Sequence, residues 1–254
     1  DRLIVYHLAR ELSQRGHVID LLAFSNRIED LAERDQYANF FRSVTLIPES
    51  PRSQLDMMMR ALNLRPRFAE SADQAWSPEM ARLITEKLAH NRYDVAHIFG
   101  GIHVYEYAPL LGTLPAIITP YESYALFLRR VMQNYTRVDR KIAAWVVMKI
   151  ARRFESFMFE PYRATVVVSP VDGKELTDIN PRLNIRVIPN GCAFAQFSNP
   201  IPDRDGSRIL FTGNYEYEPN VDAAKRLING VLPKVRARYP DAKVWIVGNA
   251  PPPE

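Results

Sequence analysis

The segment IRVIPNGCAFAQF, residues 185–197, sets the organisation of the chain. Its short apolar run ends at Pro189-Asn190-Gly191, a combination of residues that marks a turn. The next apolar run, RILFTG, follows at residues 208–213. Between them, QFSNPIPDRDGS is rich in Pro, Asp and Ser and offers little surface to bury. The pattern predicts two units, residues 1–195 and 208–254, joined by a linker at residues 196–207.

Strand-like runs recur along the whole chain, with helical patterns between them. Most are continuous apolar stretches, which are typical of strands buried on both faces of a parallel sheet. Alternation of such strands with helices indicates an α/β fold with doubly wound parallel sheets. The predicted strands are residues 17–24, 43–48, 94–99, 115–120, 164–169, 185–189, 208–213 and 243–248.

Three of the intervening helices have clear end signals. The first helix of the chain is predicted to end at Gly16, since glycine favours the residue just after a helix. Ser77 and Pro78 suit the cap and the first position of another helix. Asn220 is predicted to cap a third helix, in which Pro233 introduces a kink.

The order of these elements indicates that both units continue outside the chain. A helix that leads into a parallel strand normally follows an earlier strand, so a strand is expected before Asp1. The second unit offers only strand, helix and strand, which would leave a sheet face uncovered. Its remainder is therefore expected after Glu254.

Composition limits the classes of protein to consider. The chain has 254 residues, a net charge of +4 and 47% hydrophobic residues, which is typical of a soluble globular protein. The single cysteine, Cys192, cannot form an intrachain disulfide and favours a cytoplasmic location. Apolar runs fall short of the roughly 18 residues that a membrane span needs. The modest charge and the lack of a binding motif argue against nucleic acid as a partner.

The first group of candidate site residues follows the predicted strand 94–99. Ligands of open parallel sheets bind beyond the carboxyl ends of the strands. Gly100 and Gly101, followed by His103, would let the backbone approach a ligand closely, or would only make a tight turn. His97 lies within the strand itself, where it is either a hydrogen-bonded core residue or a catalytic one.

Tyr121 and Glu122 follow the predicted strand 115–120. A carboxylate at this position could accept hydrogen bonds from sugar hydroxyls or act as a general base. The alternative is structural, because acidic residues also favour the first turn of a helix.

The second unit offers a candidate anion site. Gly213 and Asn214 precede a helix, and a glycine turn at a helix N-terminus can hold a phosphate. The nearby Glu216 and Glu218 oppose an anion, and no G-x-G-x-x-G or Walker A motif is present. Cys192 is interpreted as a structural thiol, since no base partner is apparent. Together with His97 and His103 it makes no recognisable zinc pattern, so no metal site is expected.

The segment at residues 128–154 is rich in Arg and Lys. Its apolar residues Ile142, Trp145, Val146, Met148 and Ile150 are interpreted as belonging to helices that cover the sheet. The alternative is contact with a membrane surface, made by basic residues near the apolar ones. The basic residues concerned are Arg129, Arg130, Arg137, Arg140 and Lys141.

Taken together, these motifs resemble the retaining, nucleotide-sugar-dependent glycosyltransferases of the GT-B fold, the glycosyl transferase group 1 family. IRVIPNGCAFAQF is similar to the family's vipNGvD…F segment. Residues 208–252 resemble the opening of its second domain, with an LP kink followed by VG. DRLIVYHLARELSQRGHVIDLL resembles its first helix and second strand, and RYDVAHIFGG resembles its DvvHvhg strand.

The resemblance implies two Rossmann-like domains that face a cleft. The acceptor, a carbohydrate such as a polysaccharide, a lipid-linked sugar or a small molecule, would bind mainly to the first domain. The nucleotide sugar would bind mainly to the second, without a cofactor and usually without a metal. Glu122 and Tyr121 are the catalytic candidates; His97, Gly100, Gly101, His103 and Arg2 are the acceptor-side candidates; Gly213, Asn214, Asn190 and Gly191 are the donor-side candidates.

Several positions depart from the family pattern. Tyr121 stands where many members have histidine, and Asn214 and the Pro219-Asn220 region stand where many have phosphate-binding cations. Such charge-assisted contacts contribute roughly 1.5–3 kcal/mol each. Backbone amides, Arg2 or residues after Glu254 would have to replace them. The alternative is a catalytically impaired GT-B-like protein that serves as a binding or assembly subunit; an epimerase would need an acid–base pair that the sequence does not offer.

Overall fold

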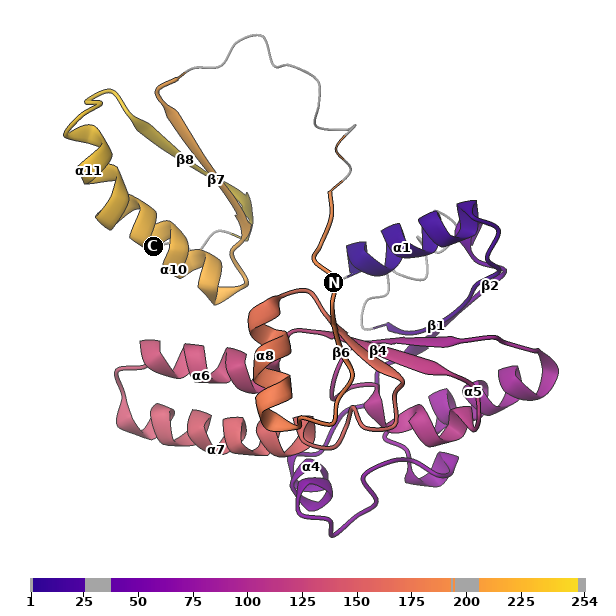
Figure 1. The fold of residues 1–254 in the computed structure, drawn as a ribbon. Coiled ribbons are helices and arrows are strands. Elements are labelled where there is room, and N and C mark those ends of the chain that lie inside the picture. Colours follow the sequence, from indigo (N-terminus) through magenta and orange to yellow (C-terminus); the bar gives the residue numbers. More distant parts are fainter. Residues whose placement is uncertain (1, 26–37, 193, 195–205, 251–254) are drawn as a thin grey trace. The chain divides into compact units, whose positions relative to one another are not determined.

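The computed structural model describes residues 2–25, 38–192, 194 and 206–250. The chain divides into two compact units, Asp1–Gly191 and Cys192–Glu254 (Figure 1). Within the described ranges every strand pair is parallel, so the predicted α/β class with parallel sheets is confirmed. Of the predicted linker at residues 196–207, residues 196–205 lie outside the described part.

The strands of the first unit form two hydrogen-bonded groups. β1 (Asp20–Ser25) pairs with β2 (Ser43–Pro48), and the other group has the order β3-β4-β5-β6. Because these four strands are parallel, their carboxyl ends meet at one edge of the sheet. A strand before Asp1 stays a prediction. The four strands are Ala96–Phe99, Ala116–Tyr121, Ala164–Val167 and Ile185–Val187.

Serine residues begin several helices of the first unit. The hydroxyl of Ser77 accepts a hydrogen bond from Met80 N at 3.3 Å, with Pro78 in the first turn, so this predicted helix start is confirmed. Gly16, with φ +85°, follows the first helix as predicted. The helices are α1 (Arg2–Gln14), α4 (Gln54–Ala61), α5 (Pro78–His90), α6 (Tyr124–Asn134), α7 (Val138–Glu155) and α8 (Pro170–Ile179).

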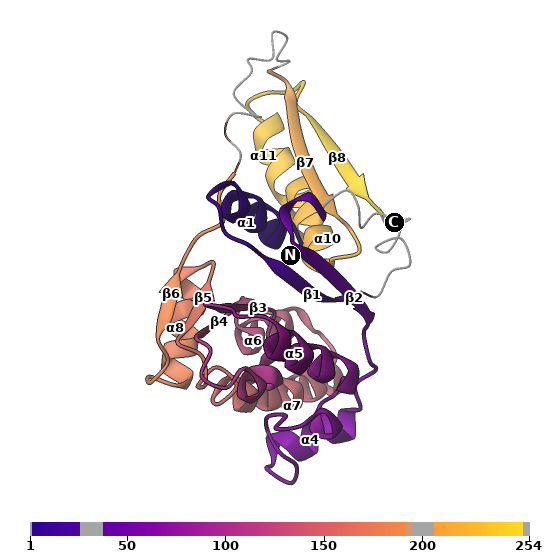
Figure 2. The ribbon, with the colours of Figure 1, turned by 90° about the vertical axis from the view of Figure 1, so that its right-hand side faces the viewer.

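An aromatic core lies beneath strands β3–β6, on the side covered by α5 and α7 (Figure 2). Tyr105, Phe154 and Phe159 are at most 1% exposed. Beside them, the buried Arg60 donates to Asp56 Oδ2 at 3.0 Å and to Glu106 Oε2 at 2.8 Å. This ion-pair network fixes α4 against the 3₁₀ helix Tyr105–Leu111, since a buried charge needs its partners in place.

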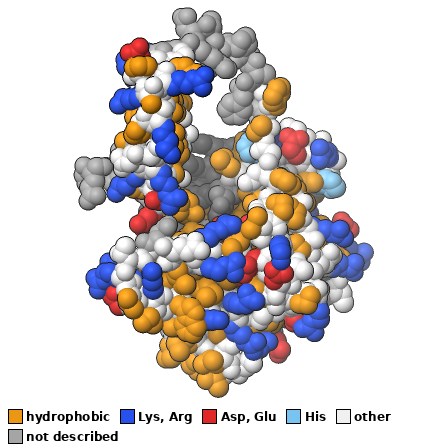
Figure 3. Space-filling view, turned by 60° about the vertical axis from the view of Figure 1, so that its left-hand side comes forward, with side chains coloured by type: hydrophobic (Ala, Val, Ile, Leu, Met, Phe, Trp, Pro, Cys, Tyr) orange, Lys and Arg blue, Asp and Glu red, His pale blue; other side chains and the backbone are white. Residues whose placement is uncertain are grey.

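The helices α6 and α7 form a hairpin that covers the sheet only in part. Ile150 packs against the main core, as predicted, whereas Met148 packs against a small cluster between α6 and α7. For Ile142, Trp145 and Val146 the prediction of sheet cover is wrong, because they are 59%, 50% and 45% exposed. Figure 3 shows hydrophobic side chains gathered among Lys and Arg side chains in the lower part of the view. These three residues lie in the first half of α7, before the residues of that helix that pack against buried ones.

The second unit contains one strand–helix–strand unit within its described residues. β7 (Arg208–Asn214) pairs with β8 (Lys243–Asn249), and α10 (Glu218–Arg226) and α11 (Leu232–Arg236) connect them. A π-helical turn, Leu227–Val231, separates the two helices just before Pro233. This is the irregularity expected where proline removes an N–H from a helix.

Two predictions for this unit are wrong. α10 begins at Glu218 with Tyr217 as its cap residue, and Asn220 lies inside the first turn, where its Nδ2 donates to Asn214 O at 2.9 Å. β7 and β8 are also not buried on both faces: Leu210 and Trp245 are 62% and 48% exposed. The helices cover only one side of this strand pair, so the other side stays open in the described residues.

The strand pair β7–β8 depends on glycine at residue 248. Gly248 has φ +157°, and a Cβ there would lie 1.7 Å from Gly213 O. We expect Gly248→Ala to lower the stability of the pair by about 2 kcal/mol, because strain and overlap add. Hydrogen exchange of the β7 and β8 amides measures this effect. Gly230→Ala, where a Cβ meets nothing within 4 Å, is the control, and equal exchange in both variants would contradict the expectation.

Candidate functional site

The turn after β3 requires glycine at its first position. Gly100 has φ +117°, and an added Cβ would lie 3.1 Å from Val104 Cγ2. Its N–H donates to Thr119 O of β4 at 2.9 Å. A Cβ on Gly101 would meet only ordinary contacts, 3.8 Å from Pro120 Cβ. Gly100 is therefore required for the tight turn. Gly101 leaves its backbone without a covering side chain at the carboxyl edge of the sheet.

His97 is held in the sheet by the two strands around it. Its Nε2 lies 2.7 Å from Thr119 Oγ1, and its ring stacks on Phe99 with 3.9 Å between centroids. Burial lowers the pKa of His97 to about 4, so the imidazole is neutral at pH 7. These contacts favour the structural interpretation of His97 over a catalytic one.

Tyr121 ends β4 in a conformation that is uncommon for a residue with a side chain. Its φ is +71°, after an irregularity in the pairing of β4 with β5 between Ile118 and Tyr121. Tyr121 O accepts a hydrogen bond from Val168 N at 3.3 Å. Burial raises the pKa of its hydroxyl to about 12, so the hydroxyl stays protonated at pH 7. A left-handed residue at a strand end is typical of functional sites.

Glu122 is the exposed carboxylate at this edge. Partial burial and the nearby Asp172 carboxylate raise the pKa of Glu122, while Arg130 acts in the opposite direction. A raised pKa brings a carboxylate closer to the range in which it accepts a proton efficiently near neutral pH.

Two buried acids that the sequence analysis missed hold the start of α6 beneath this loop. Glu155, 1% exposed, accepts hydrogen bonds from Ser123 Oγ at 3.0 Å, Tyr124 N at 2.7 Å and Ala125 N at 3.3 Å. Asp172 accepts one from Ser123 N at 2.9 Å. Carboxylates at a helix N-terminus satisfy N–H groups that have no partner within the helix. The signal in the sequence that could have revealed Glu155 was its position among the aromatic residues at 154–159.

His103 lies in a polar cluster with residues that follow β2. Its Nδ1 lies 3.0 Å from Glu49 Oε1 and 3.2 Å from Arg52 Nε, and Arg52 Nη2 donates to His103 O at 2.7 Å. The Arg52 guanidinium also stacks over Trp76, 4.3 Å from the ring centroid. Glu49 directly follows β2, as Glu122 directly follows β4, so the rule that ligands bind beyond strand ends would also have found Glu49.

The remaining predicted residues of the first unit lie in two places. Asn190 and Gly191 are exposed and follow β6, at the same carboxyl edge as Gly100 and Tyr121. Arg2 begins α1, and its side chain lies outside the described part. The edge therefore brings together His97, Gly100, Gly101, Tyr121 and Glu122, with His103 and Asn190 on the loops that leave it. Cys192, in the second unit, is exposed and free.

In the second unit, the loop after β7 is closed by its own hydrogen bonds. Tyr215 N donates to Asn249 O at 2.9 Å, Glu216 N to Asn214 Oδ1 at 3.3 Å, and Tyr217 N to Asn214 O at 3.3 Å. A Cβ on Gly213 would lie 3.1 Å from Asn220 Nδ2, so glycine allows the first turn of α10 to approach the strand. Residues 213–220 contain no Lys or Arg.

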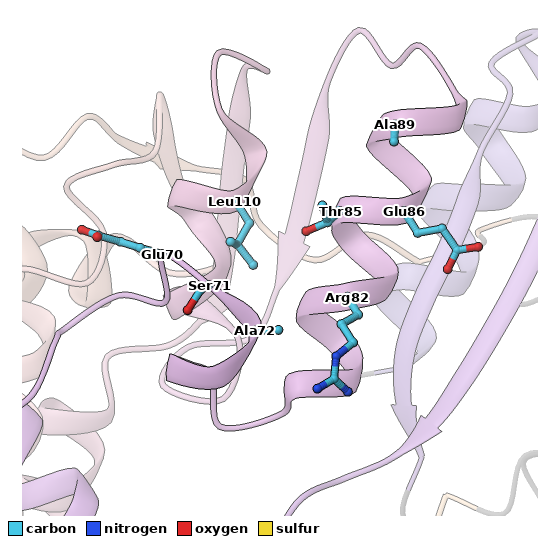
Figure 4. A pocket seen from close by; sticks show the side chains of 8 residues that line it. All are labelled: Glu70, Ser71, Ala72, Arg82, Thr85, Glu86, Ala89 and Leu110. Atoms are coloured by element: carbon cyan, nitrogen blue, oxygen red, sulfur yellow. The ribbon is translucent and has the colours of Figure 1, made fainter.

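A shallow pocket of about 580 Å³ lies elsewhere in the first unit (Figure 4). Arg82, Thr85 and Glu86 of α5 line one side of it, with Glu70 and Leu110 among the other lining residues. The candidate site residues do not line this pocket. Among the residues that the structure describes, no His, Cys, Asp and Glu side chains cluster in a way that could hold a metal ion.

Comparison with known proteins gives a family for the chain. The chain is similar to a solved structure titled "Crystal Structure Analysis of the Glycotransferase of kitacinnamycin", with 15% identity and a TM-score of 0.45. That match covers 95% of this chain and 60% of the other, so the chain spans about 60% of that protein's length. No curated protein matches significantly. The model of Glycosyltransferase Family 4 matches residues 3–195. Because the match covers well over half of the chain, this protein belongs to Glycosyltransferase Family 4.

Proposed function

We propose that this chain belongs to a glycosyltransferase that moves a sugar from a nucleotide sugar to an acceptor hydroxyl with retention of configuration. The observation that carries the proposal is the family match over the first unit, combined with a carboxylate at the carboxyl edge of that unit's sheet. In open parallel sheets this edge is where ligands bind. Acceptors of three kinds fit it: a glycan, a lipid-linked sugar or a small molecule.

In this proposal the carboxylate of Glu122 accepts a hydrogen bond from the acceptor hydroxyl. The bond between the anomeric carbon and the diphosphate oxygen breaks, and the acceptor oxygen bonds to the same face of the sugar. The acceptor proton passes to Glu122 or to the departing diphosphate, which leaves with the bonding electrons. In this proposal the hydroxyl of the adjacent residue Tyr121, protonated at pH 7, serves as a hydrogen-bond donor to the substrates.

The donor side is proposed for the second unit, at Gly213 and Asn214, with Asn190 and Gly191 contributing from the first. The start of α10 supports this, since the N-terminal end of a helix favours a phosphate. Residues 213–220 lack cations, and the N–H groups of Tyr215, Glu216 and Tyr217 are already used within the unit. Side-chain amides and the remaining N–H groups at the start of α10 would therefore make the contacts. A resident cofactor or metal is not part of the proposal, and the site of action is proposed to be the cytoplasm.

The test uses the full-length protein with a panel of nucleotide sugars. Release of nucleoside diphosphate and transfer to added acceptors are expected for one donor, and the anomeric configuration of the product, read by NMR, decides retention. The absence of turnover and of nucleotide binding across the whole panel would contradict the proposal.

A second candidate function is a catalytically impaired binding or assembly subunit. The loop after β7 favours this candidate, because Tyr215, Glu216 and Tyr217 already donate their N–H groups to acceptors within the unit. Calorimetry with nucleoside diphosphates separates the two candidates. Micromolar affinity supports the transferase, whereas the subunit is expected to give no binding heat.

A further inference from the structure

An apolar stripe runs along the solvent-facing side of α7. Val138, Ile142, Trp145 and Val146 have the spacing i, i+4, i+7 and i+8, which places them on one helix face. They are 70%, 59%, 50% and 45% exposed. Exposed apolar residues are common singly, but a contiguous stripe of four, including a tryptophan, is typical of an interaction surface.

The charge around this stripe is strongly one-sided. Residues 124–155 contain eight Lys or Arg and two acidic residues, a net charge of +6, whereas the whole chain carries +4. Of the two acids, Glu155 is buried and Asp139 is hydrogen-bonded to Arg137. Glu175 of α8 forms ion pairs with Arg129 and Arg152, which leaves the lysines of α7 as the cations nearest the stripe. Lys141 and Lys149 are exposed on the side of α7 that carries the stripe, and Lys149 Nζ lies 5.3 Å from the Trp145 ring centroid. Lys141 and Lys149 therefore lie beside the apolar stripe.

The helix α4 extends the surface. It packs beside α7, where Arg153 Nε donates to Ala61 O at 3.3 Å. Leu55 and Met58 of α4 and Leu62, which directly follows the helix, are 66%, 48% and 62% exposed and are spaced i, i+3 and i+7. Figure 3 shows such a gathering of hydrophobic side chains with Lys and Arg around them.

We propose that this surface of α7 and α4 docks onto an anionic lipid bilayer. A helix whose apolar stripe is framed by Lys and Arg can lie in the interface, with its apolar side chains among the acyl chains and its cations at the headgroups. A second copy of the chain fits less well, because two such surfaces would bring like charges together. Within the described residues, no helix is both long and apolar enough to cross a membrane.

Sedimentation with vesicles tests this proposal on the full-length protein. We expect binding to phosphatidylcholine vesicles that contain 30 mol% phosphatidylserine, little binding to pure phosphatidylcholine, and weaker binding at higher salt. The fluorescence of Trp145 should shift to the blue on binding, and Trp145→Phe should remove the shift. Because each cation near an anionic membrane contributes a few-fold in affinity, Lys141→Glu with Lys149→Glu should weaken binding by at least about tenfold.

The matched control is Arg92→Glu with Arg186→Glu, which changes the net charge equally at exposed positions away from α7. Binding that is equal in the two double variants, or equal on both kinds of vesicle, would overturn the proposal. So would failure of the wild-type protein to bind. If Ile142→Ser abolishes self-association in solution instead of vesicle binding, the surface is an interface between copies. Nucleotide binding is measured separately, so the proposed transferase function can fail while the membrane-docking proposal stands.

Discussion

Glu122→Gln is expected to slow sugar transfer by roughly 10²–10⁴-fold, which is the usual contribution of a general base. The amide has nearly the shape of the carboxylate but cannot accept the proton of the acceptor hydroxyl. Because Glu122 is exposed, the free energy of unfolding should change by less than about 0.5 kcal/mol. Turnover of the best nucleotide sugar and acceptor, with thermal unfolding measured in parallel, checks both expectations.

Glu79→Gln, at an exposed position in the first turn of α5, is the matched control for this loss of charge. It should leave turnover unchanged. Wild-type turnover in Glu122→Gln would remove the catalytic role and leave Glu122 as a helix-start residue.

The pH dependence of turnover separates a base from a residue that only positions the acceptor. A base must be ionised, so the rate should rise with pH through the pKa of Glu122. The Asp172 carboxylate helps to raise that pKa. Asp172→Asn should therefore move the rising limb to lower pH, while Asn still offers an oxygen to Ser123 N. A profile unchanged by this substitution would argue against Glu122 as the group that titrates.

The architecture was predictable because it depends on local patterns. Each predicted strand coincides with an observed one, since continuous apolar runs between helical patterns leave few alternatives. Strand ends differed by up to three residues: the run at 17–24 begins its pairing only at Asp20. An apolar pattern shows which residues can be buried, whereas pairing depends on which strands lie beside them.

The candidate site was predictable only in outline. The rule that ligands lie beyond strand ends found Gly100, Tyr121 and Glu122, because this rule needs only the order of the elements. It did not find Glu155, which is 33 residues from Glu122 in sequence and acts through the packing of α7 on α6. The exposure of Ile142 and Trp145 was missed for a related reason. Periodicity shows that a helix has an apolar face, but not whether the fold provides a partner for it.

Glu155→Ala is expected to lower the free energy of unfolding by roughly 3–5 kcal/mol, because it leaves buried N–H groups without acceptors and opens a cavity. The donors affected are Tyr124 N, Ala125 N and Ser123 Oγ. Loss of these bonds should also loosen the loop that carries Glu122, so turnover should fall even at temperatures where the variant is folded. Urea unfolding measures the first effect, and hydrogen exchange at Tyr124 and Ala125 measures the second.

Glu155→Gln distinguishes the carboxyl group's charge from its role as an acceptor. Burial raises the pKa of Glu155 to about 7 from an ordinary value of 4.5, so the folded state binds a proton that the unfolded state has released between these pH values. This contribution to stability is therefore largest below about pH 4.5 and is lost as the pH rises to 7, at a cost of roughly 3 kcal/mol. Gln keeps an acceptor for the N–H groups but does not titrate. The stability of the wild type relative to Glu155→Gln should thus fall across this window, and a constant difference would mean that the ionised carboxylate is already stabilised by the N-terminus of α6.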